Sequence, residues 1–158
     1  GFPGVPLKIA FPHLEACLLD SLKKRVNFLE ETFALLKLEN ITAIHGRAEE
    51  FAKNKAYREQ YDLCVSRAVS NLATLSEYCL PYVKVGGNFI SYKSGTVQEE
   101  LQQAEKAVKI LGGKIQDVVY FNLPDSEIQR SLVVIEKMKP TPGRYPRKAG
   151  TPLKEPLS

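Results

Sequence analysis

Histidine and cysteine are scarce in this chain, with two histidines and three cysteines among 158 residues. Cys17, Cys64 and Cys79 lie within apolar stretches and have no metal-ligand spacing. We therefore expect them to be reduced core residues of a cytosolic protein, and we expect no metal site. His13 and His45 belong to no credible Ser-His-Asp set, so both are interpreted as structural residues.

Long hydrophobic runs and a triphosphate-binding motif are also missing. No apolar run is long enough to span a bilayer and no signal peptide opens the chain, so we expect a soluble, cytoplasmic protein without membrane contact. The lack of a Walker lysine motif argues against a triphosphate site. Internal repeats are absent too. A composition of 44% apolar and 25% charged residues favours one compact domain.

The net charge of +4 is unevenly distributed. Residues 1–136 hold 16 Lys and Arg against 17 Asp and Glu, whereas residues 137–158 hold six against one. The last 19 residues also contain five prolines and no hydrophobic periodicity. We predict a domain over residues 1–138 and an extended, basic, Pro-rich arm over residues 139–158. Such an arm suits polyanion binding, although it can also serve solubility alone.

Hydrophobic periodicity predicts a Rossmann-like α/β fold with a mostly parallel sheet. Short apolar or β-branched runs that lead into helical patterns end near residues 20, 45, 67 and 92. The last two runs, at 115–122 and 131–137, are joined by a short link that fits an antiparallel hairpin. A short helix at 5–10 opens the pattern with no strand before it. We therefore expect the first strand of a doubly wound sheet, and the segment that carries it, to be missing from this chain.

Polar residues follow three of these strands, at the edge where open α/β sheets bind ligands. They are Asp20, then Ala48-Glu49, then Ser66-Arg67. An acid at the first position could accept two hydrogen bonds from a ribose, although Asp20 could instead cap the following helix. Two acids and an arginine suit a nucleoside ligand. An acid after the second strand also serves NAD, so a nicotinamide-dependent oxidoreductase remains an alternative.

Three cations occupy the first turn of the helix that follows Asp20, where the helix dipole disfavours positive charge. They are Lys23, Lys24 and Arg25. A phosphate backbone would offset that penalty, and a solvated face is the equally good alternative. The other candidates for phosphate contact lie in the arm: Arg144, Arg147 and Lys148.

Five segments in order resemble one family. They are Gly1-Phe2-Pro3-Gly4-Val5-Pro6-Leu7, Leu19-Asp20-Ser21-Leu22-Lys23-Lys24-Arg25-Val26, Gly46-Arg47-Ala48-Glu49, Ser66-Arg67-Ala68-Val69 and Arg144-Tyr145-Pro146-Arg147-Lys148-Ala149-Gly150-Thr151-Pro152. Together they resemble the bacterial small-subunit ribosomal RNA guanine-N7 methyltransferases, the glucose-inhibited division protein B family. The resemblance covers essentially the whole chain. It implies a class I methyltransferase that uses S-adenosylmethionine to methylate N7 of a guanosine in small-subunit ribosomal RNA.

The same resemblance implies roles for single residues. Phe2 would line the cofactor pocket, Asp20 would hold the ribose, Ala48 and Glu49 would contact the adenine, and Arg67 would border the methionine end. Because guanine N7 already carries a lone pair, we expect no catalytic proton-transfer residue.

Only the end of the family's glycine-rich loop, Gly1-Phe2-Pro3, is present here. The central strand and the N-terminal helices of the family are absent, so its two neighbouring strands would lack a partner for their backbone groups. The expected partner is small-subunit ribosomal RNA or the small ribosomal subunit, bound by a monomer. A noncatalytic RNA-binding module is the alternative that a truncated chain leaves open.

Overall fold

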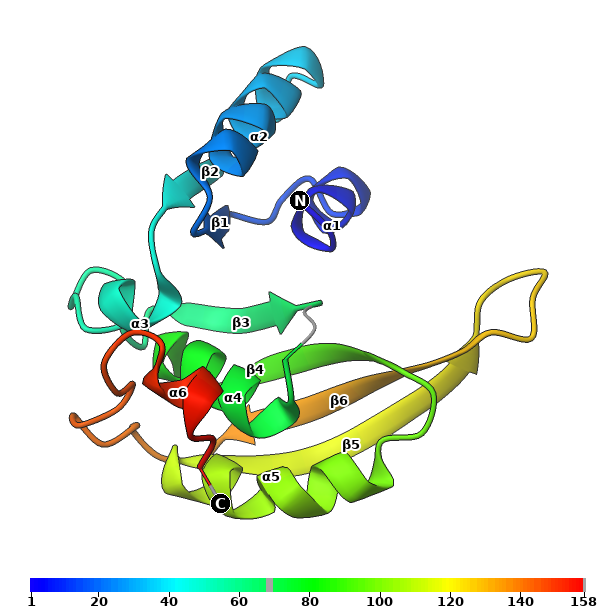
Figure 1. Ribbon diagram of the computed structural model, residues 1–158. Coiled ribbons are helices and arrows are strands. Elements are labelled where there is room, and N and C mark those ends of the chain that lie inside the picture. The colour runs from blue at the N-terminus through cyan, green and yellow to red at the C-terminus, as the bar shows by residue number, and fades with distance from the viewer. Residues whose placement is uncertain (68–69, 158) are drawn as a thin grey trace.

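The computed structural model describes residues 1–67 and 70–157. Within them, six strands form two separate sheets, as Figure 1 shows. The smaller sheet has the order β1-β2 and the larger has the order β3-β4-β6-β5. The strands are β1 (Ala16–Asp20), β2 (Ile41–His45), β3 (Tyr61–Ser66), β4 (Val83–Ser94), β5 (Gly113–Asn122) and β6 (Gln129–Lys137).

The smaller sheet carries the first two helices, α1 (Gly4–Ala10) and α2 (Lys23–Leu35). Strands β1 and β2 are parallel, and Asp20 pairs in register with His45 at their carboxyl ends. Helix α2 buries Val26, Leu29 and Phe33, as the spacing of its apolar residues predicts. The spacing of four and three residues also predicts Leu22 and Leu36 on this buried face. That prediction is wrong, because both are cap residues outside the helix and about half exposed.

The larger sheet holds the main core, against α4 (Leu72–Cys79), the 3-10 turn η1 (Leu80–Tyr82) and α5 (Gln98–Ile110). Strand β3 is parallel to β4, whereas the pairs β4–β6 and β6–β5 are antiparallel. The predicted final hairpin is therefore confirmed. Buried side chains on one face of β4 and β6 alternate with partly buried ones and pack under the helices, Phe89 and Ile135 being fully buried.

The segment Lys84-Val85-Gly86-Gly87 predicts the end of the preceding helix and the start of a strand at 88–92, and this strand boundary is wrong. Strand β4 begins at Val83 and passes through both glycines. Gly86 has a φ of +87°, and a Cβ atom on Gly87 would lie 2.5 Å from the carbonyl oxygen of Asp62 in β3. The glycines therefore allow a local irregularity in the β3–β4 register, at which the two backbones approach closely.

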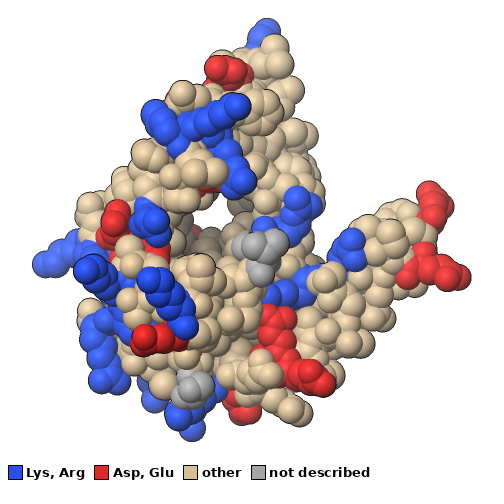
Figure 2. Space-filling view, in the orientation of Figure 1, with Lys and Arg blue, Asp and Glu red and all other residues tan. Residues whose placement is uncertain are grey.

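Strands β1 and β3 each have one unpaired edge. Over the described ranges, β1 pairs with β2 alone and β3 with β4 alone. The space-filling view shows an opening through the molecule between the part that carries β1 and the part that carries β3 (Figure 2). Over these ranges, the backbone groups along one edge of β1 and one edge of β3 have no strand partner.

The C-terminal residues differ most from expectation. Residues 141–155, here called the C-terminal strap, fold back on the body instead of extending from it, and they end in the short helix α6 (Thr151–Lys154) beside α4. Tyr145 in the strap is 7% exposed. The strap has no hydrophobic periodicity because no apolar stripe attaches it to the body. Hydrogen bonds to charged groups of the body, described below, hold it instead.

Candidate nucleoside-binding edge and its supports

Asp20 ends β1 and has a partly exposed side chain. Its Oδ1 accepts a hydrogen bond from the backbone N–H of Leu22 at 2.9 Å, and its Oδ2 lies 3.5 Å from Nη1 of Arg25. The alternative offered by sequence reasoning, that Asp20 caps the following helix, is not what the structure contains: α2 has no side-chain cap, and Asp20 instead closes the turn before it. One ion pair at this distance leaves carboxylate lone pairs free for a ligand hydroxyl.

The loop after β2 lies next to Asp20, because the N–H of Gly46 donates to the carbonyl of Asp20 at 3.0 Å. This loop leads into α3 (Ala48–Phe51). The Ala48 carbonyl accepts a hydrogen bond from the Tyr82 hydroxyl at 2.6 Å. Glu49 is buried, and its Oε1 accepts from the N–H of Gly150 at 2.8 Å. That oxygen of Glu49 is therefore engaged by the C-terminal strap.

Phe2 and Arg67 lie in contact with each other. The Arg67 guanidinium carbon lies 4.3 Å from the centre of the Phe2 ring. The Phe2 ring also meets Tyr92 of β4 edge-on, with ring centres 6.3 Å apart. The N-terminal segment thus reaches the carboxyl ends of β3 and β4. Ala68 and Val69, which follow Arg67 in its motif, lie outside the described residues.

The candidate phosphate-binding cations fall into two groups. Lys23, Lys24 and Arg25 are exposed at the start of α2, and Arg144 and Lys148 are exposed on the C-terminal strap. Figure 2 shows Lys and Arg gathered over α2 and over the side formed by α3 and the strap, whereas acidic side chains mark the tip of the β5–β6 hairpin.

Arg147 differs from the other cations, and its placement corrects the expectation of a free phosphate contact. Its Nη2 lies 2.7 Å from Oε2 of Glu77, its Nε bonds both carboxylate oxygens, and its backbone N–H donates to Oε1. The Glu77 side chain is 1% exposed. Hydrogen bonding to Glu77 raises the pKa of Arg147 above its ordinary value. The guanidinium therefore neutralises a buried carboxylate.

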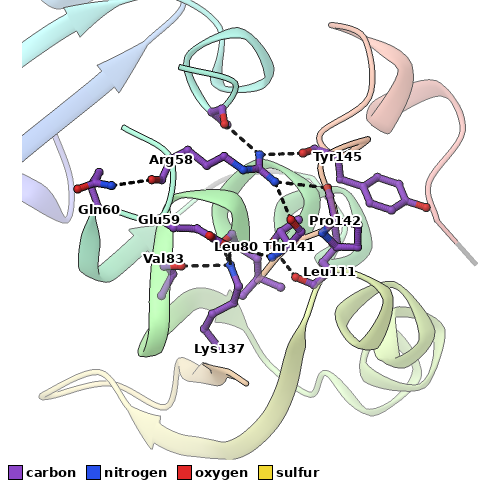
Figure 3. A network of polar contacts seen from close by, with 11 residues as sticks. Arg58, Glu59, Gln60, Leu80, Val83, Leu111, Lys137, Thr141, Pro142 and Tyr145 are labelled. Carbon is purple, nitrogen blue, oxygen red and sulfur yellow. Dashed lines mark hydrogen bonds and ion pairs between the residues drawn. The ribbon is translucent and has the colours of Figure 1, made fainter. Parts of the chain in front are cut away.

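Figure 3 shows a second buried network that sequence reasoning missed. Nζ of Lys137 donates to the carbonyls of Leu80 and Val83 and lies 3.1 Å from Oε1 of Glu59, which also accepts from the N–H of Thr141. Burial lowers the pKa of Lys137. The inward alternation of β6, which ends at Lys137, was the available signal for this burial.

The neighbouring Arg58 fastens the strap from the other side. Its guanidinium donates to the strap carbonyls of Thr141, Pro142 and Tyr145 and to the carbonyl of Ala52 (Figure 3). No sequence pattern indicated this role, because all of these acceptors are backbone atoms.

Other kinds of site find no support in the part of the chain that the structure describes. It contains no group of three or more His, Cys, Asp or Glu side chains that could hold a metal ion, and none of its helices has the length and apolar character needed to cross a membrane. The two best-formed hollows lie at the start of α5 and between α4, α5 and the C-terminal end. Neither is lined by Asp20, Glu49 or Arg67.

The fold is that of known methyltransferase structures. M. jannaschii TYW2 in complex with AdoMet aligns with a TM-score of 0.64 and 14% identity, over 87% of this chain and 65% of that one. An rRNA methylase from Streptococcus thermophilus aligns with a TM-score of 0.54 and 17% identity, over 78% of this chain and 73% of that one. The expected Rossmann-like class I methyltransferase fold is confirmed.

Sequence comparison gives the family. The model of the GidB family, described as rRNA small subunit methyltransferase G, matches residues 1–133. Curated relatives named ribosomal RNA small subunit methyltransferase G include those of Lachnoclostridium phytofermentans, 57% identical, and Alkaliphilus oremlandii, 56% identical, each over 99% of this chain. The chain spans 65% and 66% of the length of these relatives. The resemblance seen in its motifs is thereby confirmed, and the chain belongs to the GidB family of rRNA small subunit methyltransferases G.

Proposed function

We propose that the protein transfers a methyl group from S-adenosylmethionine to N7 of a guanosine in small-subunit ribosomal RNA. The relatives that share more than half of this sequence are named for methylation of that RNA. The observation in the structure that carries the proposal is the pairing of Phe2 with Arg67 at the end of β3, on a fold in which Asp20 ends β1.

The residues at the strand ends suit a nucleoside with a charged tail. The Asp20 carboxylate can accept ribose hydroxyls, each charge-assisted hydrogen bond contributing about 1.5–3 kcal/mol. The backbone N–H groups of Ala48 and Glu49 lie in the first turn of α3, where they lack intrahelical acceptors and can donate to an adenine ring. The Arg67 guanidinium can pair with the carboxylate of the methionine portion, while the exposed Phe2 ring covers an apolar part of the cofactor.

The reaction asks for positioning more than for proton transfer. When bound, the cofactor supplies a methyl group on a sulfonium, which is a good leaving group. Guanine N7 presents a lone pair and no proton, so this chain needs no general base. Its residues would bind the two reactants, hold them in line and exclude water.

Ribosomal RNA, free or within the small ribosomal subunit, is the proposed partner of a cytoplasmic monomer. Lys23, Lys24 and Arg25 at the start of α2 are exposed close to Asp20, and Arg144 and Lys148 add a second basic area on the C-terminal strap. Cations on an otherwise near-neutral body suit a phosphate backbone. Arg147 is left out of this set because Glu77 holds its guanidinium.

The proposal is tested by incubating the complete protein with labelled S-adenosylmethionine and small ribosomal subunits from a strain that lacks this enzyme. Label is expected on the RNA, with strand scission at one guanosine after borohydride and aniline treatment, which cleaves at 7-methylguanosine. RNA binding without label would instead support a noncatalytic RNA-binding module. Binding of NADH in place of S-adenosylmethionine would support the oxidoreductase alternative.

A further inference from the structure

The C-terminal strap is fastened to the body by a buried ion pair. Arg147 makes four hydrogen bonds to the Glu77 carboxylate, three from its side chain and one from its backbone, and its Nη2 also donates to the Glu155 carbonyl at 2.7 Å. Thr74, in the same helix as Glu77, donates its hydroxyl to the Pro152 carbonyl at 2.9 Å. The strap from 147 to 155 is thus held rigidly on α4.

From this anchored segment, the strap reaches the loop after β2. The N–H of Gly150 donates to Oε1 of Glu49, a contact that joins residues 101 positions apart in the sequence. Gly150 has a φ of +85°, a left-handed conformation that other residues adopt at a cost. Since Glu49 is 5% exposed, its carboxylate lies between the strap and the body.

Helix α3 depends on such outside contacts. It has four residues, far fewer than a helix needs to be stable by itself. Its first turn is held by Tyr82, through the Ala48 carbonyl, and by Gly150, through the Glu49 side chain. One of these two supports belongs to the body and the other to the strap.

We propose that the C-terminal strap helps to position the cofactor. The Arg147–Glu77 ion pair anchors the strap on α4, and the hydrogen bond from Gly150 to Glu49 then fixes the first turn of α3 relative to Asp20. This inference rests on the proposed function, in which that turn meets the adenine. It gives the strap a role in cofactor affinity that is separate from RNA contact by its exposed cations. Arg147 and Glu49 are positioning residues in this scheme.

The test uses variants of the complete protein. Arg147→Lys keeps the charge but loses the forked contact with Glu77. The double variant Glu77→Gln/Arg147→Gln removes both charges, so no unpaired buried carboxylate remains if Arg147→Lys folds poorly. Lys154→Ala removes an exposed cation of α6 and is the matched control. Calorimetry with S-adenosylhomocysteine gives cofactor affinity, steady-state kinetics separate kcat from KM, and amide hydrogen exchange follows residues 46–52.

Both strap variants are expected to weaken S-adenosylhomocysteine binding about 3- to 30-fold. The KM for S-adenosylmethionine should rise in parallel, with kcat changed less than about twofold. Amides at 46–52 should exchange faster, and Lys154→Ala should match the wild type in all three measurements.

Two results would overturn the inference while leaving the proposed function intact. One is unchanged cofactor affinity with weaker RNA binding, which would make the strap an RNA-binding arm. The other is unchanged cofactor affinity with a lower melting temperature, which would make it a structural brace only. Failure of the wild-type protein to bind S-adenosylhomocysteine would instead overturn the proposed function, and the inference with it.

Discussion

At the scale of single residues, Asp20 combines two roles that a substitution can separate. Its Oδ1 accepts a hydrogen bond from the Leu22 N–H and so closes the turn before α2, and the rest of its carboxylate is available to a ribose. Alanine would remove both functions. Asparagine keeps an oxygen for the Leu22 N–H but replaces the other acceptor by a donor.

Asp20→Ala is therefore expected to weaken cofactor binding by at least about tenfold, the loss of roughly one charge-assisted hydrogen bond. Asp20→Asn should be impaired nearly as much, while its melting temperature stays closer to that of the wild type. Calorimetry and thermal unfolding of the complete protein measure both effects. If Asp20→Asn binds the cofactor as tightly as the wild type, Asp20 serves only to close the turn before α2.

The raised pKa of Tyr82 implies that the stability of the folded protein changes with pH in the alkaline range. Burial raises the pKa of the Tyr82 hydroxyl above its ordinary value of 10.0, and the nearby Cys64 thiol raises it further. Above about pH 10 the unfolded chain loses this proton while the folded chain keeps it, so the folded state binds more protons and its stability falls as pH rises. The loss should begin near the unfolded pKa and continue up to the raised folded one.

Tyr82→Phe removes that titration. It should be less stable than the wild type near neutral pH by about 1 kcal/mol, the loss of the hydrogen bond to Ala48. Between about pH 9 and about pH 11 its stability should fall less steeply. Urea unfolding across this range gives the two slopes. The pKa values of partly buried Tyr61 and buried Cys79 are also raised, and these two residues are present in both proteins. Parallel slopes would contradict the role of Tyr82.

At the scale of secondary-structure elements, α2 combines a buried face with a basic first turn. Val26, Leu29 and Phe33 attach it to the small sheet, which leaves Lys23 and Lys24 exposed at the end where the helix dipole opposes cations. No acidic residue lies in that turn to compensate. This arrangement favours an anionic partner close to Asp20.

The double variant Lys23→Ala/Lys24→Ala should reduce the slope of log affinity for small-subunit RNA against log salt concentration by about 1.4–1.8, the release of counterions from two contacts. Its cofactor affinity and melting temperature should stay at or above those of the wild type. Filter binding at several salt concentrations measures the slope. As a control, Lys109→Ala removes an exposed cation at the far end of α5 and should leave the slope unchanged.

At the scale of the whole molecule, the strands are unequal in their backbone hydrogen bonding. In the 158-residue chain, β6 lies between β4 and β5, whereas β1 and β3 each have an open edge. Main-chain groups along an open edge exchange with solvent readily and can pair with other chains. Leu63 in β3 is 45% exposed, although buried parallel strands normally cover such residues.

Hydrogen exchange of the 158-residue chain should reflect this difference. Peptides that cover residues 16–20 and 61–66 are expected to exchange at least about 100-fold faster than the peptide that covers 129–137. Mass spectrometry measures all three in one experiment, so β6 serves as the internal control. Uniform protection across the three strands would mean that the open edges are covered in solution.

The sequence by itself determined the elements of this protein and the residues at their ends. Apolar runs and helical spacing are local properties, so β2 at Ile41–His45 and the buried stripe of α2 could be predicted from neighbouring residues alone. The roles of Asp20, Phe2 and Arg67 are predictions from resemblance to a family, whereas the contact between the Phe2 ring and the Arg67 guanidinium appeared only in the structure. The start of β4 was predicted too late because two glycines can mark either a bulge within a strand or the boundary between two elements.

Only the tertiary structure decided where the charged side chains lie. Arg147 binds Glu77, which lies 70 residues away in the sequence, and Gly150 binds Glu49, which lies 101 residues away. Lys137, at the end of β6, forms an ion pair with Glu59. The alternation of β6 marks Lys137 as inward-facing, but no periodic pattern in the sequence gives the partner of any of these groups, because each partner alone resembles a solvated group. Such pairs form only when folding brings buried charges together and removes their water, and that is why the basic C-terminal segment became a strap on the body.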